Sequence, residues 1–158
     1  MTIYFDTSAL LKLYVTEEYS DITRELLNKS RQVSTSLVSY AEARSAFARR
    51  RREKSLAGLN EKELVDLLDL EWPRYYLIGV SKPLVISAAD LASIHGLKAY
   101  DALHLASALE LQRNLKRSVT FVAFDQSLNR AAKKVGLKLV KTVADYSSPD
   151  RPKRPKNR

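Results

Sequence analysis

The run of residues 119–124 restricts the fold more than any other segment, because it is apolar almost throughout. A nearly continuous apolar run of this length is typical of a strand that is covered on both faces, as strands are in a parallel sheet. Shorter strand-like segments are found at residues 3–5, 32–35, 76–78 and 137–140. The chain is therefore expected to build a sheet of short, buried strands.

Segments with helical periodicity lie between these strands. Asn60 and Glu63 have the spacing of a capping box at a helix start, and Pro83 and Gly96 are suited to the first residue and the end of another helix. Helices are predicted at residues 8–15, 22–27, 37–54, 60–71, 84–95, 100–114 and 128–135. Alternation of this kind predicts an α/β fold, with a central parallel sheet and helices on both faces.

The length and charge of the chain suggest one folded domain with an acidic partner. A chain of 158 residues can bury one core, which we assign to residues 1–146. Residues 147–158 form a basic tail rich in Pro, Lys and Arg that is expected to be disordered. This tail carries +4 of the net charge of +9. Such a charge favours nucleic acid, an anionic membrane surface or an acidic protein as partner.

Several classes of protein are disfavoured by what the sequence lacks. There is no cysteine, so a disulfide framework and a thiolate zinc site are excluded. The first residues do not have the pattern of a secretory signal, and no apolar run is long enough to cross a bilayer. We therefore expect a cytoplasmic protein with no membrane partner.

Acidic residues follow the predicted strands. Asp6 comes directly after the first strand, Asp125 directly after residues 119–124, and Glu42 lies early in the helix that follows the second strand. In a parallel sheet these positions meet at the carboxyl edge, where ligands bind. Asp101, at a helix start, can join them if its helix packs beside the first strand. Clustered carboxylates need a cation, and an all-oxygen site suits Mg²⁺ or Mn²⁺.

A local structural role is the alternative for each of these acids. Asp6, Asp101 and Asp125 stand where helix N-caps stand, and Ser39 and Glu42 have capping-box spacing. Helix caps, however, have no reason to collect at one edge of one sheet. Convergence of the four carboxylates would therefore favour a metal site.

Four blocks of sequence resemble the PIN-domain nucleases, and in particular the VapC-type toxins of prokaryotic toxin–antitoxin pairs. The blocks come in the order of that family and span most of residues 2–140. They are residues 3–11 around Asp6, residues 36–46 around Glu42, residues 96–106 around Asp101, and residues 121–137 around Asp125. The resemblance implies a PIN-like three-layer α/β/α fold with a central parallel sheet.

The resemblance also implies roles for individual residues. Asp6, Glu42 and Asp101 would be the core metal-binding acids, Asp125 the fourth, and Ser8 a polar helper near the metal. The expected activity is Mg²⁺-dependent cleavage of cellular RNA, either tRNA or rRNA, which inhibits translation. The expected partners are a cognate antitoxin and a second copy of the chain.

Basic and histidine side chains supply further candidates. Arg49 to Arg52 form the densest basic run of the folded part, and Arg49 and Arg52 are candidate RNA contacts; a solvated helix end is the alternative. His104 follows Asp101 by three residues and is interpreted as a packed, hydrogen-bonded side chain, with metal ligation or general-base catalysis as the alternatives. His95 fits a helix C-terminus.

Other functions remain compatible with the sequence. A PIN-domain nuclease of RNA processing or quality control would carry the same acids, and so would a metal-dependent DNase. A non-catalytic RNA-binding module on the same fold is a third alternative, which the complete acidic set disfavours.

Overall fold

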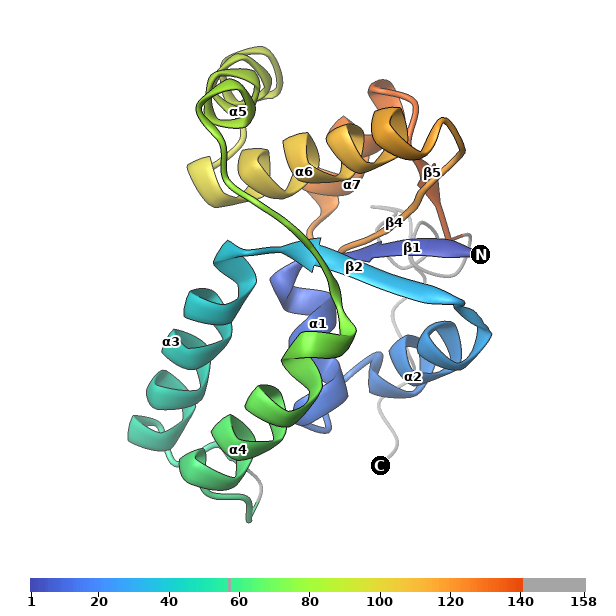
Figure 1. Cartoon of the computed structure of the whole chain (residues 1–158). Helices are drawn as coiled ribbons and strands as arrows, with labels where there is room; N and C mark the ends of the chain where they lie inside the picture. Colours follow the sequence, from blue (N-terminus) through green and yellow to red (C-terminus); the bar gives the residue numbers. More distant parts are fainter. Residues whose placement is uncertain (57, 141–158) are drawn as a thin grey trace, which may run out of the picture.

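The computed structural model describes residues 1–56 and 58–140 and forms three layers, α/β/α (Figure 1). The predicted boundary at residue 146 and the basic tail, residues 147–158, lie outside the described residues. Within residues 1–56 and 58–140, no helix is long and apolar enough to cross a membrane. The elements are β1 (Thr2–Phe5), α1 (Thr7–Tyr14), α2 (Ser20–Lys29), β2 (Gln32–Ser36), α3 (Val38–Arg52), α4 (Glu61–Glu71), the 3₁₀ turn η1 (Trp72–Arg74), β3 (Tyr76–Ile78), α5 (Lys82–His95), α6 (Ala99–Leu115), β4 (Thr120–Val122), α7 (Gln126–Lys134) and β5 (Lys138–Leu139).

The sheet has five parallel strands in the order β3-β2-β1-β4-β5, which confirms the predicted fold class. The first strand of the chain lies at the centre, with Tyr4 beside Ser34 of β2 and Phe121 of β4. Parallel neighbours place all carboxyl ends at one edge of the sheet. The chain therefore emerges from β1, β2 and β4 at the same side of the molecule.

Successive residues of β1 serve the two faces of the sheet, as the two-residue period of a strand requires. Ile3 and Phe5 are buried in a core shared with α1, α2, α3 and α4. Tyr4 is buried in a second core, shared with α5, α6 and α7. Figure 1 shows these two groups of helices on opposite sides of the sheet. Because β1 is covered on both sides, its end is held in place from both sides.

Local signals placed most helix ends correctly. Asn60 accepts a hydrogen bond from the Glu63 N–H at 2.8 Å, and Glu63 accepts one from the Asn60 N–H at 3.3 Å, which confirms the capping box. Gly96 ends α5 with a φ of 64°, the left-handed conformation in which glycine is favoured.

The strand predicted at residues 119–124 is shorter than expected and covers Thr120–Val122. The ladder with β1 ends where the Asp6 N–H donates to the Val122 carbonyl at 3.1 Å. Beyond it, the Phe124 N–H donates to the Ser8 hydroxyl at 3.4 Å instead of to a neighbouring strand. Asp125 therefore follows a short connection rather than the strand itself.

Candidate metal centre

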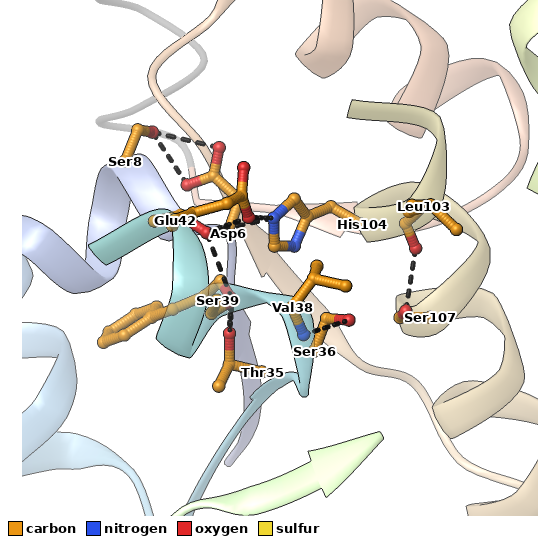
Figure 2. A network of polar contacts seen from close by, with 12 residues as sticks. Asp6, Ser8, Thr35, Ser36, Val38, Ser39, Glu42, Leu103, His104 and Ser107 are labelled. Carbon is orange, nitrogen blue, oxygen red and sulfur yellow. Dashed lines mark hydrogen bonds and ion pairs between the residues drawn. The ribbon is translucent and has the colours of Figure 1, made fainter. Parts of the chain in front are cut away.

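The carboxyl edge of the sheet gathers acidic side chains from four helix starts. Asp6 precedes α1, Glu42 lies in the second turn of α3, Asp101 in the first turn of α6, and Asp125 precedes α7. Figure 2 shows Asp6 and Glu42 close to each other, with the ring of His104 beside them.

Asp6 is both a helix cap and a buried carboxylate. Its Oδ1 accepts hydrogen bonds from the Ala9 N–H at 2.8 Å and from the Ser8 hydroxyl at 2.7 Å. Only 5% of the residue is exposed, and this burial raises the pKa of Asp6 to about 6, although those hydrogen bonds and the His104 imidazole act in the opposite direction. A cap alone needs no burial. The structure therefore places an acid with a destabilised charge at the end of β1.

Ser8, predicted as a polar helper near the metal, lies beside Asp6. Its hydroxyl is within 2.7 and 3.0 Å of the two carboxylate oxygens of Asp6. It also accepts the Phe124 N–H, so that it joins the ends of β1 and β4. Ser8 thus fixes the orientation of the Asp6 carboxylate.

Glu42 does not form the capping box that its spacing with Ser39 suggested. The cap residue of α3 is Leu37, which makes no side-chain capping bond, and Ser39 lies inside the helix with its hydroxyl 2.7 Å from that of Thr35. Instead, Oε2 of Glu42 accepts hydrogen bonds from Thr7 at 2.5 Å and from His104 Nε2 at 2.7 Å. Burial acts to raise the pKa of Glu42, but the contacts with His104 and Thr7 outweigh it and lower the pKa.

Asp101 and Asp125 differ in their local roles. The cap of α6 is Lys98, without a side-chain bond, so the cap alternative for Asp101 is wrong. Asp125 does cap α7, because it accepts the Leu128 N–H at 2.8 Å, and its side chain is exposed. Burial is the main cause that raises the pKa of Asp101, and the charge of Asp125 adds to it. The raised pKa of Asp101 thus depends in part on the charge of Asp125.

The four acids are ligands of the type that a divalent cation prefers, although their side chains do not form a close cluster within residues 1–56 and 58–140. No three His, Asp or Glu side chains within residues 1–56 and 58–140 converge closely enough to enclose a metal. The donors at this edge are all carboxylate oxygens, which suit Mg²⁺ or Mn²⁺. Negative neighbours contribute to the raised pKa values of both Asp6 and Asp101, and a cation would relieve that repulsion.

A hollow of about 430 Å³ is lined by one of the acids, Glu42, and extends along α3. Glu42 and Arg49 of α3 both line it, together with Ser45 of the same helix and Ser8 of α1. Arg50 and Arg51 form ion pairs with Glu17 and Glu61, both at 2.6 Å, whereas Arg49 and Arg52 form none within the part of the chain that the structure describes. The two predicted RNA contacts are thus the cations of this run that are free to bind an anion.

Tyr100 also lines this hollow and was not singled out from the sequence. Its side chain lies at the start of α6, next to Asp101, and 54% of the residue is exposed. A lone tyrosine has no spacing that distinguishes it from the others in the chain. Only the packing of α6 across the sheet edge brings it beside Arg49 and Glu42.

His104 is packed and hydrogen-bonded, as interpreted from the sequence. It is 2% exposed, with Nδ1 at 2.8 Å from the Tyr4 hydroxyl and Nε2 bonded to Glu42. The hydrogen bond to Glu42 was not predicted, because the two residues are far apart in the sequence and their helices, α6 and α3, pack on opposite faces of the sheet. The other histidine, His95, ends α5 before Gly96, as predicted.

The fold and the acidic edge together define an α/β/α domain with an oxygen-donor site at the carboxyl ends of a parallel sheet. The chain belongs to the PIN domain family, which it matches over residues 3–134.

Relatives in this family include ribonucleases of Mycobacterium tuberculosis. Ribonuclease VapC46 of strain ATCC 25618 / H37Rv is 30% identical over 138 residues, covering 87% of this chain and 95% of that protein. Ribonuclease VapC47 of strain CDC 1551 / Oshkosh is 31% identical over 140 residues, covering 85% and 92%. The resemblance to VapC proteins therefore extends over most of both chains.

Solved structures share the fold at lower sequence identity. VapBC2 from Rickettsia felis, bound to a DNA fragment from its promoter, superposes with a TM-score of 0.60 at 16% identity, covering 89% of this chain and 98% of that chain. VapBC-1 from nontypeable Haemophilus influenzae gives a TM-score of 0.60 at 14% identity, covering 89% and 97%.

Proposed function

We propose that this protein is a Mg²⁺-dependent endoribonuclease that acts as the toxin of a type II toxin–antitoxin system. The observation that carries the proposal is the set of carboxylates at the carboxyl edge of the sheet. Among them, Asp6 is buried, and burial raises its pKa to about 6. Arg49 lines a hollow next to this edge. Relatives of similar length are named ribonuclease VapC, which supports RNA as the substrate. Cleavage of tRNA or rRNA in the cytoplasm would inhibit translation.

Asp6, Glu42 and Asp101 would hold the metal, with Asp125 as a fourth acid at the rim. When bound, Mg²⁺ supplies charge stabilisation at the phosphate and a more acidic water. Ser8 orients the Asp6 carboxylate through its two close contacts. Mn²⁺ has the same preference for oxygen ligands and would be expected to substitute.

The hollow along α3 would hold the RNA next to the acids. Arg49 lines the same hollow as Glu42, about two turns further along α3, where its guanidinium can bind a phosphate of the backbone. Arg52 lies one turn further along α3 and would extend this contact. Tyr100 offers an exposed ring on which an unpaired base can stack. Both contacts suit single-stranded RNA, whose bases are accessible.

A protein antitoxin and a second copy of the chain are the proposed protein partners. A solved structure that shares this fold, from Klebsiella pneumoniae, is described as a toxin–antitoxin complex. Large apolar side chains of α4 and α5 are exposed in the single chain, among them Leu67, Leu70, Ile86 and Ile94. Exposed apolar residues on two separate helices are consistent with two protein interfaces.

Sequencing of RNA 5′ ends after controlled expression tests this function. The wild type should produce new 5′ ends at defined sites and arrest growth, and Asp6→Asn should do neither. The exposed Asp90, on α5, supplies the matched control, because Asp90→Asn removes a carboxylate that is not one of the proposed metal ligands. New 5′ ends that persist with Asp6→Asn would contradict the metal mechanism. RNA cleavage without growth arrest would favour an RNA-processing nuclease.

A further inference from the structure

His104 occupies a buried position between a strand of the sheet and one acid of the site. Its ring lies edge-on to Tyr4, with centroids 6.0 Å apart, and Tyr4 in turn stacks on Phe121 at 5.6 Å. Nδ1 is 2.8 Å from the Tyr4 hydroxyl. Nε2 is 2.7 Å from Oε2 of Glu42, and Figure 2 shows the ring directed toward that carboxylate. The imidazole thus connects the centre of the sheet to Glu42.

The direction of these hydrogen bonds follows from the atoms available. An ionised carboxylate only accepts hydrogen bonds, and a glutamate is ordinarily ionised at neutral pH. Nε2 of His104 must therefore carry a hydrogen and donate it to Glu42. Tyr4 then donates to Nδ1 of a neutral ring, or accepts from it if the ring is charged. Either arrangement leaves Nε2 as the donor to Glu42.

Thr7 is a second donor to the same carboxylate oxygen, and neighbouring hydroxyl groups bond α3 to β1. Thr7 lies 2.5 Å from Oε2 of Glu42 and donates its hydrogen there. Thr35 donates its only hydroxyl hydrogen to the Phe5 carbonyl at 2.8 Å, so the 2.7 Å contact between Ser39 and Thr35 has Ser39 as donor. These bonds tie the first turn of α3 to the residue that precedes Asp6. The bond from Thr7 therefore links Glu42 to the residue that follows Asp6, and the bonds of Ser39 and Thr35 link α3 to the residue that precedes Asp6.

Both donors act on one oxygen of Glu42. Within the residues that the structure describes, Oε1 of Glu42 accepts no hydrogen bond. Half of the carboxylate is thus held by protein, and the other half is left for another ligand. Neighbouring donors of this kind orient a metal-binding side chain, and their loss typically lowers metal affinity about 10- to 100-fold.

We propose that His104, with Thr7, is a positioning residue that holds Glu42 by Oε2 and presents Oε1 as the single oxygen that this residue offers to the divalent cation. The proposal rests on the proposed metal-dependent function. The alternative is that the buried His104 only packs in the core and has no effect on the metal. A structural role predicts that loss of His104 changes stability only. A positioning role predicts a change in metal binding as well.

The test measures Mn²⁺ affinity by calorimetry, kcat and KM for an RNA that the wild type cleaves, and thermal stability, all on the full chain. His104→Leu should lower the Mn²⁺ affinity and kcat about 10- to 100-fold with little change in KM. His104→Gln keeps an N–H that can reach Glu42 and should recover part of both. His95→Gln, at the end of α5, is the matched control and should match the wild type in all three measurements.

Two outcomes would overturn the proposal. His104→Leu that is folded and binds Mn²⁺ as tightly as the wild type would show that His104 has only a structural role. If His104→Leu fails to fold, Thr7→Val removes the other donor to Glu42 while keeping the size of the side chain. Unchanged Mn²⁺ affinity in Thr7→Val would then overturn it. A wild type that binds no Mn²⁺ would instead overturn the proposed function itself.

Discussion

Replacing Asp6 by Asn should make the metal-free protein more stable while abolishing its activity. The Asp6 carboxyl is buried, and its pKa is raised from 3.8 to about 6. One pKa unit corresponds to about 1.4 kcal/mol, so ionised Asp6 destabilises the native state by about 3 kcal/mol. Asn keeps a side-chain oxygen that can cap α1 but carries no charge. The substitution therefore removes the charge and retains the cap.

The sign of the effect can be followed across pH. Below the unfolded pKa near 3.8, Asp6 is protonated in both states, and its ionisation has no effect on stability. As the pH rises toward 6, the unfolded chain releases this proton while the native state retains it, so the free energy of unfolding falls. Above about 6 the full penalty is present. The gain from Asp6→Asn should therefore be largest at neutral pH and vanish near pH 4.

Thermal unfolding between pH 4 and pH 8, in the presence of a chelator, measures this difference. At pH 7.5 the variant should melt roughly 6–12 °C above the wild type, because 1 kcal/mol shifts the midpoint of a chain of this size by roughly 2–4 °C. Asp90→Asn removes an exposed carboxylate and serves as the control. Added Mg²⁺ should stabilise the wild type and leave Asp6→Asn nearly unchanged.

Equal or lower stability of Asp6→Asn at every pH would refute this reasoning. In that case Asp6 would act as a helix cap whose charge is well solvated or favourably paired. Stabilisation of both forms by Mg²⁺ to the same extent would place the ion elsewhere.

Other substitutions separate the contributions to RNA binding and to stability. Arg49→Ala should weaken RNA binding and reduce the slope of log affinity against log salt by about 1, whereas Arg51→Ala, which breaks an ion pair with Glu61, should leave that slope unchanged in filter-binding titrations. Tyr100→Ala should weaken binding of single-stranded RNA by about 1–3 kcal/mol with no change in salt slope, and an unchanged affinity would exclude stacking. Gly96→Ala should lower the free energy of unfolding, measured with denaturant, by roughly 1 kcal/mol, because alanine is strained at a φ of 64°. The loss should not be larger, since an added Cβ would meet no neighbouring atom. Deletion of residues 149–158 should flatten the salt slope if the tail contacts RNA, and an identical slope would show that it does not.

The sequence by itself determined the α/β architecture and the position of Asp6. Short buried strands leave little choice but a parallel sheet, and in such a sheet a residue that follows the central strand must reach the carboxyl edge. Local hydrogen bonds were also predictable, because capping depends on spacing along the chain. The capping box of Asn60 and Glu63 is one example.

The tertiary structure decided which of the four acids cap a helix. Asp125 is a cap, Asp101 is not, and the capping box predicted for Ser39 and Glu42 is absent, because both side chains bond to other elements. The contact of Glu42 with His104 joins residues on α3 and α6, which pack on opposite faces of the sheet. Spacing along one helix predicts which of its residues share a face. It does not predict which side chain of a distant helix will contact that face. That meeting depends on how both layers pack against β1.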